Sequence, residues 1–370
     1  MNLASVSFRP VPRSRVRADP TQGVLIHLVH VVCTSAFAGV ERYIGALAPR
    51  QAEQGLSVTV VGGNQAAMRA ALGEAPVGEP VRLVPAASMP EAVRALNSIP
   101  RPDLINSHMS DADLAAIVIR GLRRGPRIVS TRHFGARRGS SVPARAVFGV
   151  AGRRIGAQIA ISDFVAQQIE GGCVVIRTGV ADAPPADAAH RDRTVLMAQR
   201  LEREKATDVG LRAWAATRAR ADGWRLQIAG EGAQRPDLER LVDELGIIDS
   251  VDFLGYRTDI DDLMSRAGML LAPTPREGLG LSALEGMARA LPVVASASGG
   301  HLETVGGVKD AALFPSSDWH VAADHIDRLA FAASSRDEYG ARLRSRQREE
   351  FGIQRQVDRT TEVYEEVLGS

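Results

Sequence analysis

The chain has 370 residues, of which 45% are hydrophobic and 24% are charged, and its formal net charge at pH 7 is +2. This composition is typical of a soluble globular protein, and a chain of this length is expected to form two domains. No apolar stretch approaches the roughly 20 residues of a membrane-spanning helix, which argues against an integral membrane protein. We expect no nucleic-acid partner.

The first 22 residues differ in composition from the rest of the chain. They are rich in arginine and proline and lack the apolar middle of a secretion signal, so we predict a disordered basic tail over 1–22. The two cysteines, Cys33 and Cys173, lie far apart in the sequence and lack metal-ligand spacing. This cysteine usage favours a reducing cytoplasm and no disulfide.

Charge is divided unevenly between the two halves of the chain. Residues 1–185 carry 21 arginines and 12 acidic residues, whereas residues 186–370 carry 24 basic and 31 acidic residues. A basic half indicates either contact with an anionic surface or substrate, or free drift of surface charge. Both interpretations stay open at this point.

Short β-branched apolar runs alternate with amphipathic stretches along residues 23–180. Runs that are apolar on both faces predict buried parallel strands, and the stretches between them predict helices such as 40–54 and 111–124. We therefore expect a doubly wound α/β domain over 23–180. Its predicted strands span residues 24–32, 56–62, 81–85, 104–108, 127–133, 157–162 and 173–179.

A segment of prolines, small residues and charges at 181–193 interrupts the alternation and is interpreted as an interdomain linker. Strand–helix alternation then resumes and predicts a second α/β domain over 194–353, followed by helical sequence. A cleft between the two domains is the expected binding site. The second set of predicted strands spans residues 194–200, 224–230, 251–256, 269–274, 292–296 and 311–315.

The stretch PTPREGLGLSALEGMARALPVVASASGG (273–300) holds the strongest candidate site. A strand ends at its start, a turn carries Glu277, Gly278 and Gly280, and a helix begins near Leu281 with Glu285 about one turn inside. Glycines at a helix N-terminus leave backbone N–H groups open to an anion such as a diphosphate. Glu285 would then accept hydrogen bonds from a ribose diol. Alternatively, the glycines only form a tight turn and Glu285 lies on a solvated helix face.

Glu277 and Glu285 are separated by seven residues, and the segment around them closely resembles the Glu-x7-Glu motif of the retaining GT-B glycosyltransferases, glycosyltransferase family 4. GEGAQRPDLERL (230–241) and SGGHLETV (298–305) are similar to the family's Gly-x-Gly loop and Gly-Gly-x-x-Glu turn. SAFAGVERY (35–43), INSHMS (105–110) and STRHF (130–134) resemble it more weakly. The resemblance covers most of the chain and is densest over 194–317.

This resemblance implies the GT-B fold, in which two Rossmann-like doubly wound domains face each other across a cleft. Residues 23–180 would form the acceptor side and residues 194–353 would bind a nucleotide-diphosphate sugar. The helix predicted over 354–370 would cross back onto the N-terminal domain, so that closure of the two domains completes the site.

The resemblance also implies roles for charged residues. Arg200 and Lys205, one of only two lysines in the chain, fall where the family holds the donor diphosphate. Glu285 would hold the ribose, and Glu277 and His133 would orient the sugar. His108, which ends another predicted strand, competes with His133 or lies on the acceptor side. The other implied donor contacts are Gly39, Gly255, Tyr256, Arg257, Gly278, Leu279, Gly280 and Leu281.

Asp111 and Asp113 form an Asp-x-Asp pattern like the metal motif of the other main glycosyltransferase fold. The pair lies at a predicted helix start, where aspartate caps free N–H groups, so we interpret it as a capping feature. Arg200, Lys205 and a helix N-terminus can neutralise a diphosphate without a metal ion. We expect no metal and no cofactor.

The resulting prediction is a metal-independent, retaining glycosyltransferase with an unknown sugar, lipid-linked or small-molecule acceptor. Two alternatives remain, a nucleotide-sugar epimerase of the same fold and a non-catalytic sugar-nucleotide-binding protein. We expect a cytoplasmic protein. Residues 132–156 combine arginines with Val147, Phe148 and Val150, which predicts either peripheral contact with an anionic membrane at its inner face or a core-facing helix with solvated arginines.

Overall fold

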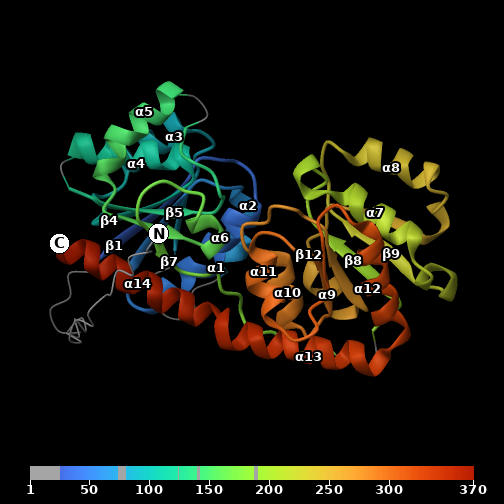
Figure 1. Ribbon diagram of the computed structural model, residues 1–370. Coiled ribbons are helices and arrows are strands. Elements are labelled where there is room, and N and C mark those ends of the chain that lie inside the picture. The colour runs from blue at the N-terminus through green and yellow to red at the C-terminus, as the bar shows by residue number, and fades with distance from the viewer. Residues whose placement is uncertain (1–25, 74–80, 124, 140–141, 187–190) are drawn as a thin grey trace, which may run out of the picture.

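The computed structural model describes residues 26–73, 81–123, 125–139, 142–186 and 191–370. Within these residues the chain forms two α/β domains, each built on one parallel sheet (Figure 1). The doubly wound, two-domain architecture predicted from the sequence is confirmed. The predicted tail at 1–22 and residues 187–190 of the predicted linker lie outside the described residues.

The N-terminal sheet has the strand order β3-β2-β1-β4-β5-β6-β7. The strand predicted at 173–179 is reduced to two residues, because Val180 leaves the sheet and pairs with Gly352. The strands are β1 His27–Val32, β2 Ser57–Val61, β3 Arg82–Val84, β4 Leu104–His108, β5 Arg127–Arg132, β6 Ala157–Ala160 and β7 Val174–Val175. The helices are α1 Gly39–Glu53, α2 Gln65–Leu72, α3 Met89–Ser98, α4 Ser110–Arg123, α5 Val142–Ala151 and α6 Asp163–Ala166.

The C-terminal sheet has the order β10-β9-β8-β11-β12-β13, again with parallel neighbours. Its strands are β8 Thr194–Ala198, β9 Arg225–Ala229, β10 Val251–Gly255, β11 Met269–Ala272, β12 Val293–Ser296 and β13 Leu313–Phe314. The helices are α7 Thr207–Ala216, α8 Arg235–Glu244, α9 Ile260–Arg266, α10 Leu281–Ala288, α11 Gly300–Thr304, α12 Trp319–Phe331, α13 Ala333–Glu350 and α14 Ile353–Gly369.

Burial on both faces explains why the strands read as continuous apolar runs. In β1, Leu28 packs in one hydrophobic cluster with Ile44 of α1, whereas its neighbour Val29 packs in a second cluster with Ile119 of α4. Successive side chains of a strand point to opposite faces, so helices must cover both sides of the sheet. The sheet is thereby held as a rigid layer whose strand ends carry the site.

The last two helices connect the domains. Helix α13 runs along the C-terminal domain and α14 continues across the N-terminal domain (Figure 1). Between them, the Val180 N–H donates to the Phe351 carbonyl at 2.9 Å, and the Ile353 N–H donates to the Val180 carbonyl at 3.2 Å. On α14, the buried Tyr364 hydroxyl accepts a hydrogen bond from Asn106 of β4 at 2.5 Å. The helix predicted over 354–370 therefore packs on the N-terminal domain.

The two domains also touch directly. The Ser162 hydroxyl of the N-terminal domain donates to the Gly278 carbonyl of the C-terminal domain at 2.6 Å. The Glu303 carboxylate of α11 accepts the backbone N–H groups of Asp163 and Phe164, at 3.0 and 2.7 Å, at the start of α6. These charge-assisted bonds across the interface fix how the strand ends of one domain face those of the other.

A pair of helical glycines tests the packing of α13. A Cβ added to the buried Gly340 would lie 2.1 Å from the Ala290 carbonyl oxygen, whereas one added to Gly121 of α4 would meet nothing within 4 Å. We expect Gly340→Ala to lower the free energy of unfolding by about 1–3 kcal/mol through overpacking. Gly121→Ala should instead raise it by about 0.5–1 kcal/mol, because alanine favours the helix. Urea denaturation of both variants checks this, and equal effects would contradict it.

Candidate active site

A cavity of about 80 Å³ lies between the two domains, at the ends of their strands. Its N-terminal wall comes from the first turn of α1 and from the segment that follows β5, and its C-terminal wall from the turn between β11 and α10. Residues from both halves of the chain therefore converge on one space. Seven residues predicted from the sequence line it, namely Gly39, His133, Glu277, Gly278, Leu279, Gly280 and Leu281.

Two glycines allow the turn before α10 to approach its neighbours closely. Gly280 has φ +95°, a left-handed conformation that L side chains rarely adopt, and a Cβ there would lie 2.8 Å from Cδ2 of His301. A Cβ on Gly278 would lie 2.6 Å from the His133 carbonyl oxygen. The first N–H groups of α10 lack helical partners and follow directly on this turn, so the cavity borders an anion-binding helix start.

Lys205 and Glu277 form an ion pair at the C-terminal wall. Lys205 ends a short 3₁₀ helix (Arg203–Lys205) after β8, and its Nζ lies 2.7 Å from Oε2 of Glu277. Burial acts to raise the pKa of Glu277, but Lys205, His301 and the Gly278 N–H together outweigh it and the pKa is lowered. Glu277 is therefore an ionised hydrogen-bond acceptor, and Lys205 is a cation held beside the α10 turn.

Arg200 lies close in sequence but is directed outward. Its guanidinium pairs with Glu204 at 2.9 Å, and its side chain is 54% exposed. The glycine loop beside it packs tightly, since a Cβ on Gly230 would lie 1.9 Å from the Gln199 carbonyl oxygen. A surface pair of this kind contributes little to stability, so Arg200 can exchange Glu204 for an anionic ligand at small cost.

Glu285 lies on α10 and pairs with Arg42 of α1 at 3.1 Å, across the domain boundary. Its Oε2 is buried and has no hydrogen-bond partner among the described residues. Burial raises the pKa of Glu285, and the nearby Arg42 only partly offsets this. Oε2 of Glu285, the carboxylate predicted to bind a ribose, is thus available to accept a hydrogen bond from a further N–H or O–H group. The sequence analysis did not single out Arg42.

Gly255, Tyr256 and Arg257 do not line the cavity. Gly255 ends β10, the edge strand of its sheet, and its carbonyl accepts the Gly230 N–H at 2.8 Å. Tyr256 is 65% exposed, and Arg257 pairs with Asp259. The three predicted base contacts therefore form an exposed strand end beside the glycine loop.

His133 and His108, treated as competitors in the sequence, contact each other. The His133 Nε2 lies 2.9 Å from the His108 Nδ1, and the His108 Nε2 lies 3.0 Å from the His30 Nδ1. His30 in turn reaches Gln51 of α1 at 2.7 Å. All three histidines are buried, and among them only His133 lines the cavity.

His301 is a site residue that sequence reasoning missed. It lies on α11, is buried, and its Nδ1 is 3.1 Å from the Ser296 hydroxyl. Burial lowers the pKa of His301, partly offset by the charge of Glu277, so the ring is neutral beside the α10 turn. Its position inside the Gly-Gly turn SGGHLETV was the available signal.

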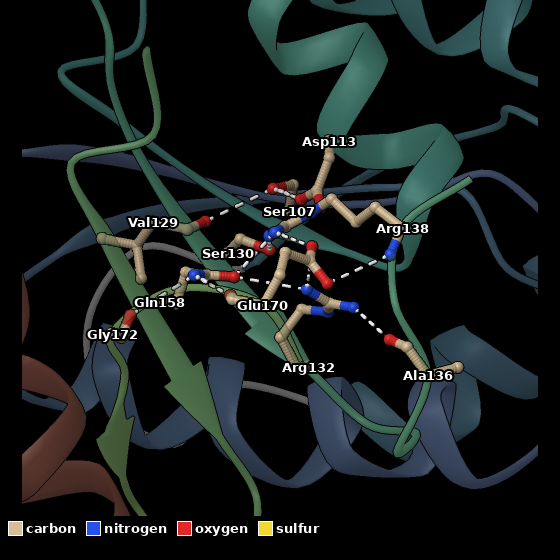
Figure 2. Close-up of polar contacts among 10 residues, drawn as sticks. All are labelled: Ser107, Asp113, Val129, Ser130, Arg132, Ala136, Arg138, Gln158, Glu170 and Gly172. Atoms are coloured by element: carbon tan, nitrogen blue, oxygen red, sulfur yellow. Dashed lines mark hydrogen bonds and ion pairs between the residues drawn. The ribbon is translucent and has the colours of Figure 1, made fainter. Parts of the chain in front are cut away.

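A buried ionic network lies beneath the N-terminal wall (Figure 2). Arg138 forms an ion pair with Asp113 and another with Glu170 at 2.8 Å, while Arg132 pairs with Glu170 at 2.9 Å. The Ser107 hydroxyl donates to Asp113 at 2.5 Å. The interpretation of Asp113 as a helix-capping residue is therefore wrong, because its carboxylate is turned inward onto Arg138.

The network also bears on the two alternatives for 132–156, because not all of its arginines are solvated. Arg132 and Arg138 are only 6% and 4% exposed, and they pair with the buried Asp113 and the partly exposed Glu170. Phe148 of α5 is buried whereas Val150 is 68% exposed, and the side chain of Val147 lies outside the described residues. The basic character that remains on this surface comes from the exposed arginines Arg137, Arg145, Arg153 and Arg154.

A second cavity, of about 220 Å³, opens on the other side of His133 in the N-terminal domain. Cys33, Asp111, Arg132 and Arg137 contribute to its wall. The exposed Phe134 borders both cavities, as His133 does. The two spaces are therefore adjacent, with a polar wall on the N-terminal side.

No helix in the described ranges is long and apolar enough to cross a membrane. In the part of the chain that the structure describes, no three or more His, Cys, Asp or Glu side chains gather in a way that could hold a metal ion.

Comparison with known proteins divides the chain at the same place as the fold. Residues 37–182 match the family described as Glycosyltransferase Family 4, and residues 182–346 match Glycosyl transferases group 1. The D-inositol 3-phosphate glycosyltransferase of Mycobacterium tuberculosis is 33% identical over 188 residues, which cover 48% of this chain and 38% of that protein. For the first three curated relatives, the matched stretches span 15–38% of the relative's length.

Solved structures share the fold over nearly the whole chain. HepE of Anabaena, crystallised with UDP and glucose, has a TM-score of 0.77 at 16% identity, covering 91% of this chain and 99% of that one. Sucrose-phosphate synthase from Thermosynechococcus elongatus has a TM-score of 0.76 at 19% identity, covering 93% and 99%. Because the two family matches adjoin and the fold agrees end to end, the chain belongs to the GT-B glycosyltransferases, family 4 in its N-terminal domain and group 1 in its C-terminal domain.

Proposed function

We propose that the protein transfers a sugar from a nucleotide-diphosphate sugar to an acceptor hydroxyl, with retention of the anomeric configuration and without a metal ion. The observation that carries the proposal is the interdomain cavity, where Glu277, held in an ion pair by Lys205, and the start of α10 face a wall that includes His133. HepE, which shares the fold, is bound to UDP and glucose, and this supports a nucleotide-sugar donor.

The donor diphosphate lies at the start of α10 in this proposal. Lys205 supplies a point charge, the N–H groups of the first helical turn supply hydrogen bonds, and Arg200 swings from Glu204 onto the same phosphates. Negative charge grows on the leaving phosphate oxygen as the glycosidic bond breaks. Donors already aimed at that oxygen therefore stabilise the transition state more than the ground state.

Glu285 and Glu277 hold the two ends of the donor. The buried Oε2 of Glu285, which lacks a partner, accepts from a ribose hydroxyl. Glu277, ionised by Lys205, accepts from sugar hydroxyls, with His133 on the opposite wall. Because Glu277 is bound to Lys205, it serves as an orienting acceptor. The acceptor oxygen attacks C1 from the side of the departing phosphate, which takes the acceptor's proton, so the configuration is retained.

The acceptor occupies the second cavity in this proposal, next to His133 and lined by Asp111, Arg132 and Arg137. A polar wall of this kind suits a hydroxyl-bearing acceptor with polar or anionic groups. Adjacency of the two cavities brings the acceptor oxygen within reach of the sugar carbon.

The two lysines of the chain provide a matched test of the diphosphate site. We expect Lys205→Ala and Arg200→Ala each to lower kcat/KM by roughly 100-fold or more, the scale of losing one preorganised charge donor. Lys309→Ala removes the only other lysine, an exposed one, and should leave kcat/KM unchanged. Product formation from a panel of nucleotide sugars, followed by mass spectrometry, gives the rates. Near-wild-type turnover in folded Lys205→Ala and Arg200→Ala would overturn the assignment.

Removal of divalent cations tests the second part of the proposal. Activity should persist after dialysis against EDTA, because protein groups neutralise the diphosphate. The initial rate with and without EDTA, and after adding back Mg²⁺ or Mn²⁺, is the measurement. Loss of activity on chelation, restored by either ion, would argue for metal-assisted transfer and return Asp111 to consideration as a ligand.

We also propose that the surface around α5 and the following 3₁₀ helix (Gly152–Arg154) contacts an anionic membrane when the acceptor is lipid-linked. Val150 of α5 is 68% exposed, and Leu122 of α4 is 67% exposed. Three arginines near Val150 in the sequence are also exposed, namely Arg145, Arg153 and Arg154. Apolar side chains with a basic fringe bind anionic bilayers, each arginine contributing roughly 1 kcal/mol at low salt.

Sedimentation with vesicles tests this contact. We expect the wild type to pellet with vesicles that contain phosphatidylserine and to stay in the supernatant with purely zwitterionic vesicles at low ionic strength. Arg153→Glu/Arg154→Glu should reduce the partition coefficient by about tenfold or more. Arg240→Glu/Arg266→Glu, on exposed residues of the C-terminal domain, should have a smaller effect. Equal recovery in the supernatant with both vesicle types would favour a soluble acceptor.

A further inference from the structure

The three buried histidines form a continuous hydrogen-bonded chain that ends at the active-site cavity. It runs from Gln51 on α1 through His30 on β1 and His108 on β4 to His133 after β5, with successive contacts of 2.7, 3.0 and 2.9 Å. The reaction described above uses only His133. A row of three buried imidazoles behind it therefore calls for a physical explanation.

The chain has a direction, set by Gln51. Its contact to His30 is made by the side-chain oxygen Oε1, which can only accept, so the His30 Nε2 carries a proton. The His30 Nδ1 then has only a lone pair and accepts from the His108 Nε2. By the same argument the His108 Nδ1 accepts from the His133 Nε2. Each neutral ring is thus held as its Nε2–H tautomer.

Neutral rings are what the surroundings favour. Burial lowers the pKa of His30 to about 4 and that of His133 to about 3, and burial together with the other two rings lowers that of His108. The ring of Tyr43 packs edge-on against His108 and His133, and burial raises the pKa of its hydroxyl to about 12. Among the described residues no carboxylate contacts the three rings, so no charge competes with Gln51 in ordering the protons.

We propose that Gln51, acting through His30 and His108, fixes the tautomer of His133, so that its Nδ1 lone pair accepts a hydrogen bond from a hydroxyl of the bound sugar. His30, His108 and Gln51 are positioning residues in this inference, which rests on the proposed donor site for its functional half. The Nδ1 makes no hydrogen bond to other described residues, and His133 lines the cavity.

The order of the protons along the three histidines decides whether the bound sugar faces an acceptor nitrogen or an N–H donor of His133. With the order set by Oε1 of Gln51, the cavity receives an acceptor nitrogen. Reversal of the three protons would present an N–H donor there instead, and a sugar hydroxyl that donates to the His133 Nδ1 would lose its acceptor. A wrong histidine tautomer is known to cost several orders of magnitude in kcat in the serine-protease triad.

The tautomers can be measured without any substrate. Long-range ¹H–¹⁵N correlation on protein labelled with ¹⁵N-histidine distinguishes a protonated ring nitrogen from a lone pair. We expect the wild type near pH 7 to show a protonated Nε2 and a bare Nδ1 for His30, His108 and His133. His108→Phe keeps a planar ring but removes the acceptor for the His133 Nε2–H, so the tautomer of His133 is no longer fixed and should become mixed.

Kinetics of the same variants test the functional half. We expect His108→Phe to lower kcat by roughly 100-fold, with the donor KM changed by less than about threefold. Gln51→Met, at the far end, should lower kcat by about two- to tenfold and give mixed tautomers, because neither polarity is then fixed. His325→Phe removes a hydrogen-bonded histidine on α12 of the C-terminal domain and should leave both readouts unchanged.

Three results would overturn the inference. The first is a protonated Nδ1 on His133 in the wild type, and the second is an unchanged His133 tautomer in both His108→Phe and Gln51→Met. The third is a changed tautomer with unchanged kcat, which removes the positioning role. Failure of the proposed function would look different, since no nucleotide sugar would be turned over while the tautomers still followed the predicted order. Gln51→Met keeps the test open if His108→Phe does not fold.

Discussion

The close contact between the turn before α10 and the segment after β5 is the constraint on which the site depends. The Gly278 backbone lies against the His133 carbonyl, and the Gly278 carbonyl accepts a hydrogen bond from the Ser162 hydroxyl. The proposed donor wall and acceptor wall therefore touch through backbone atoms. A side chain at 278 would force the two domains apart, because its Cβ would fall 2.6 Å from that carbonyl oxygen. Residues separated by more than 140 positions therefore share one cavity through a glycine.

The charged residues of the proposed donor site are paired with neighbouring side chains. Lys205 holds Glu277, Arg42 holds Glu285 and Arg200 holds Glu204. Donor binding is therefore an exchange of partners, and its net free energy is smaller than the sum of the new contacts. The pairs also keep buried carboxylates from standing uncompensated, which would be strongly destabilising. Partly exposed pairs with long side chains suit a site that must release its product as well as bind its donor.

Much of the fold and of the donor wall could be predicted from the sequence, because buried parallel strands and a glycine-rich helix start are local patterns. The Glu277 to Glu285 segment is an example, since spacing alone puts both carboxylates near one helix end. The histidine chain could not be predicted, because His30 and His108 are 78 residues apart and meet only through the register that pairs β1 with β4. Arg138 reads as a surface charge in the sequence, and only folding buries it against Asp113.

The two walls differ in how firmly they are held. Arg132, Arg138 and Asp113 are almost fully buried and Glu170 is partly exposed, and loss of these partners would leave a buried arginine unpaired. The network therefore fixes the end of β5, and with it the position of His133, more rigidly than the donor side fixes Arg200. In the proposed site, an acceptor wall held by this network faces a donor wall whose pairs can exchange, so donor binding would organise the site around a preset histidine. Because the wall that carries His133 is preorganised, the free energy of donor binding is used to rearrange the ion pairs of the C-terminal wall.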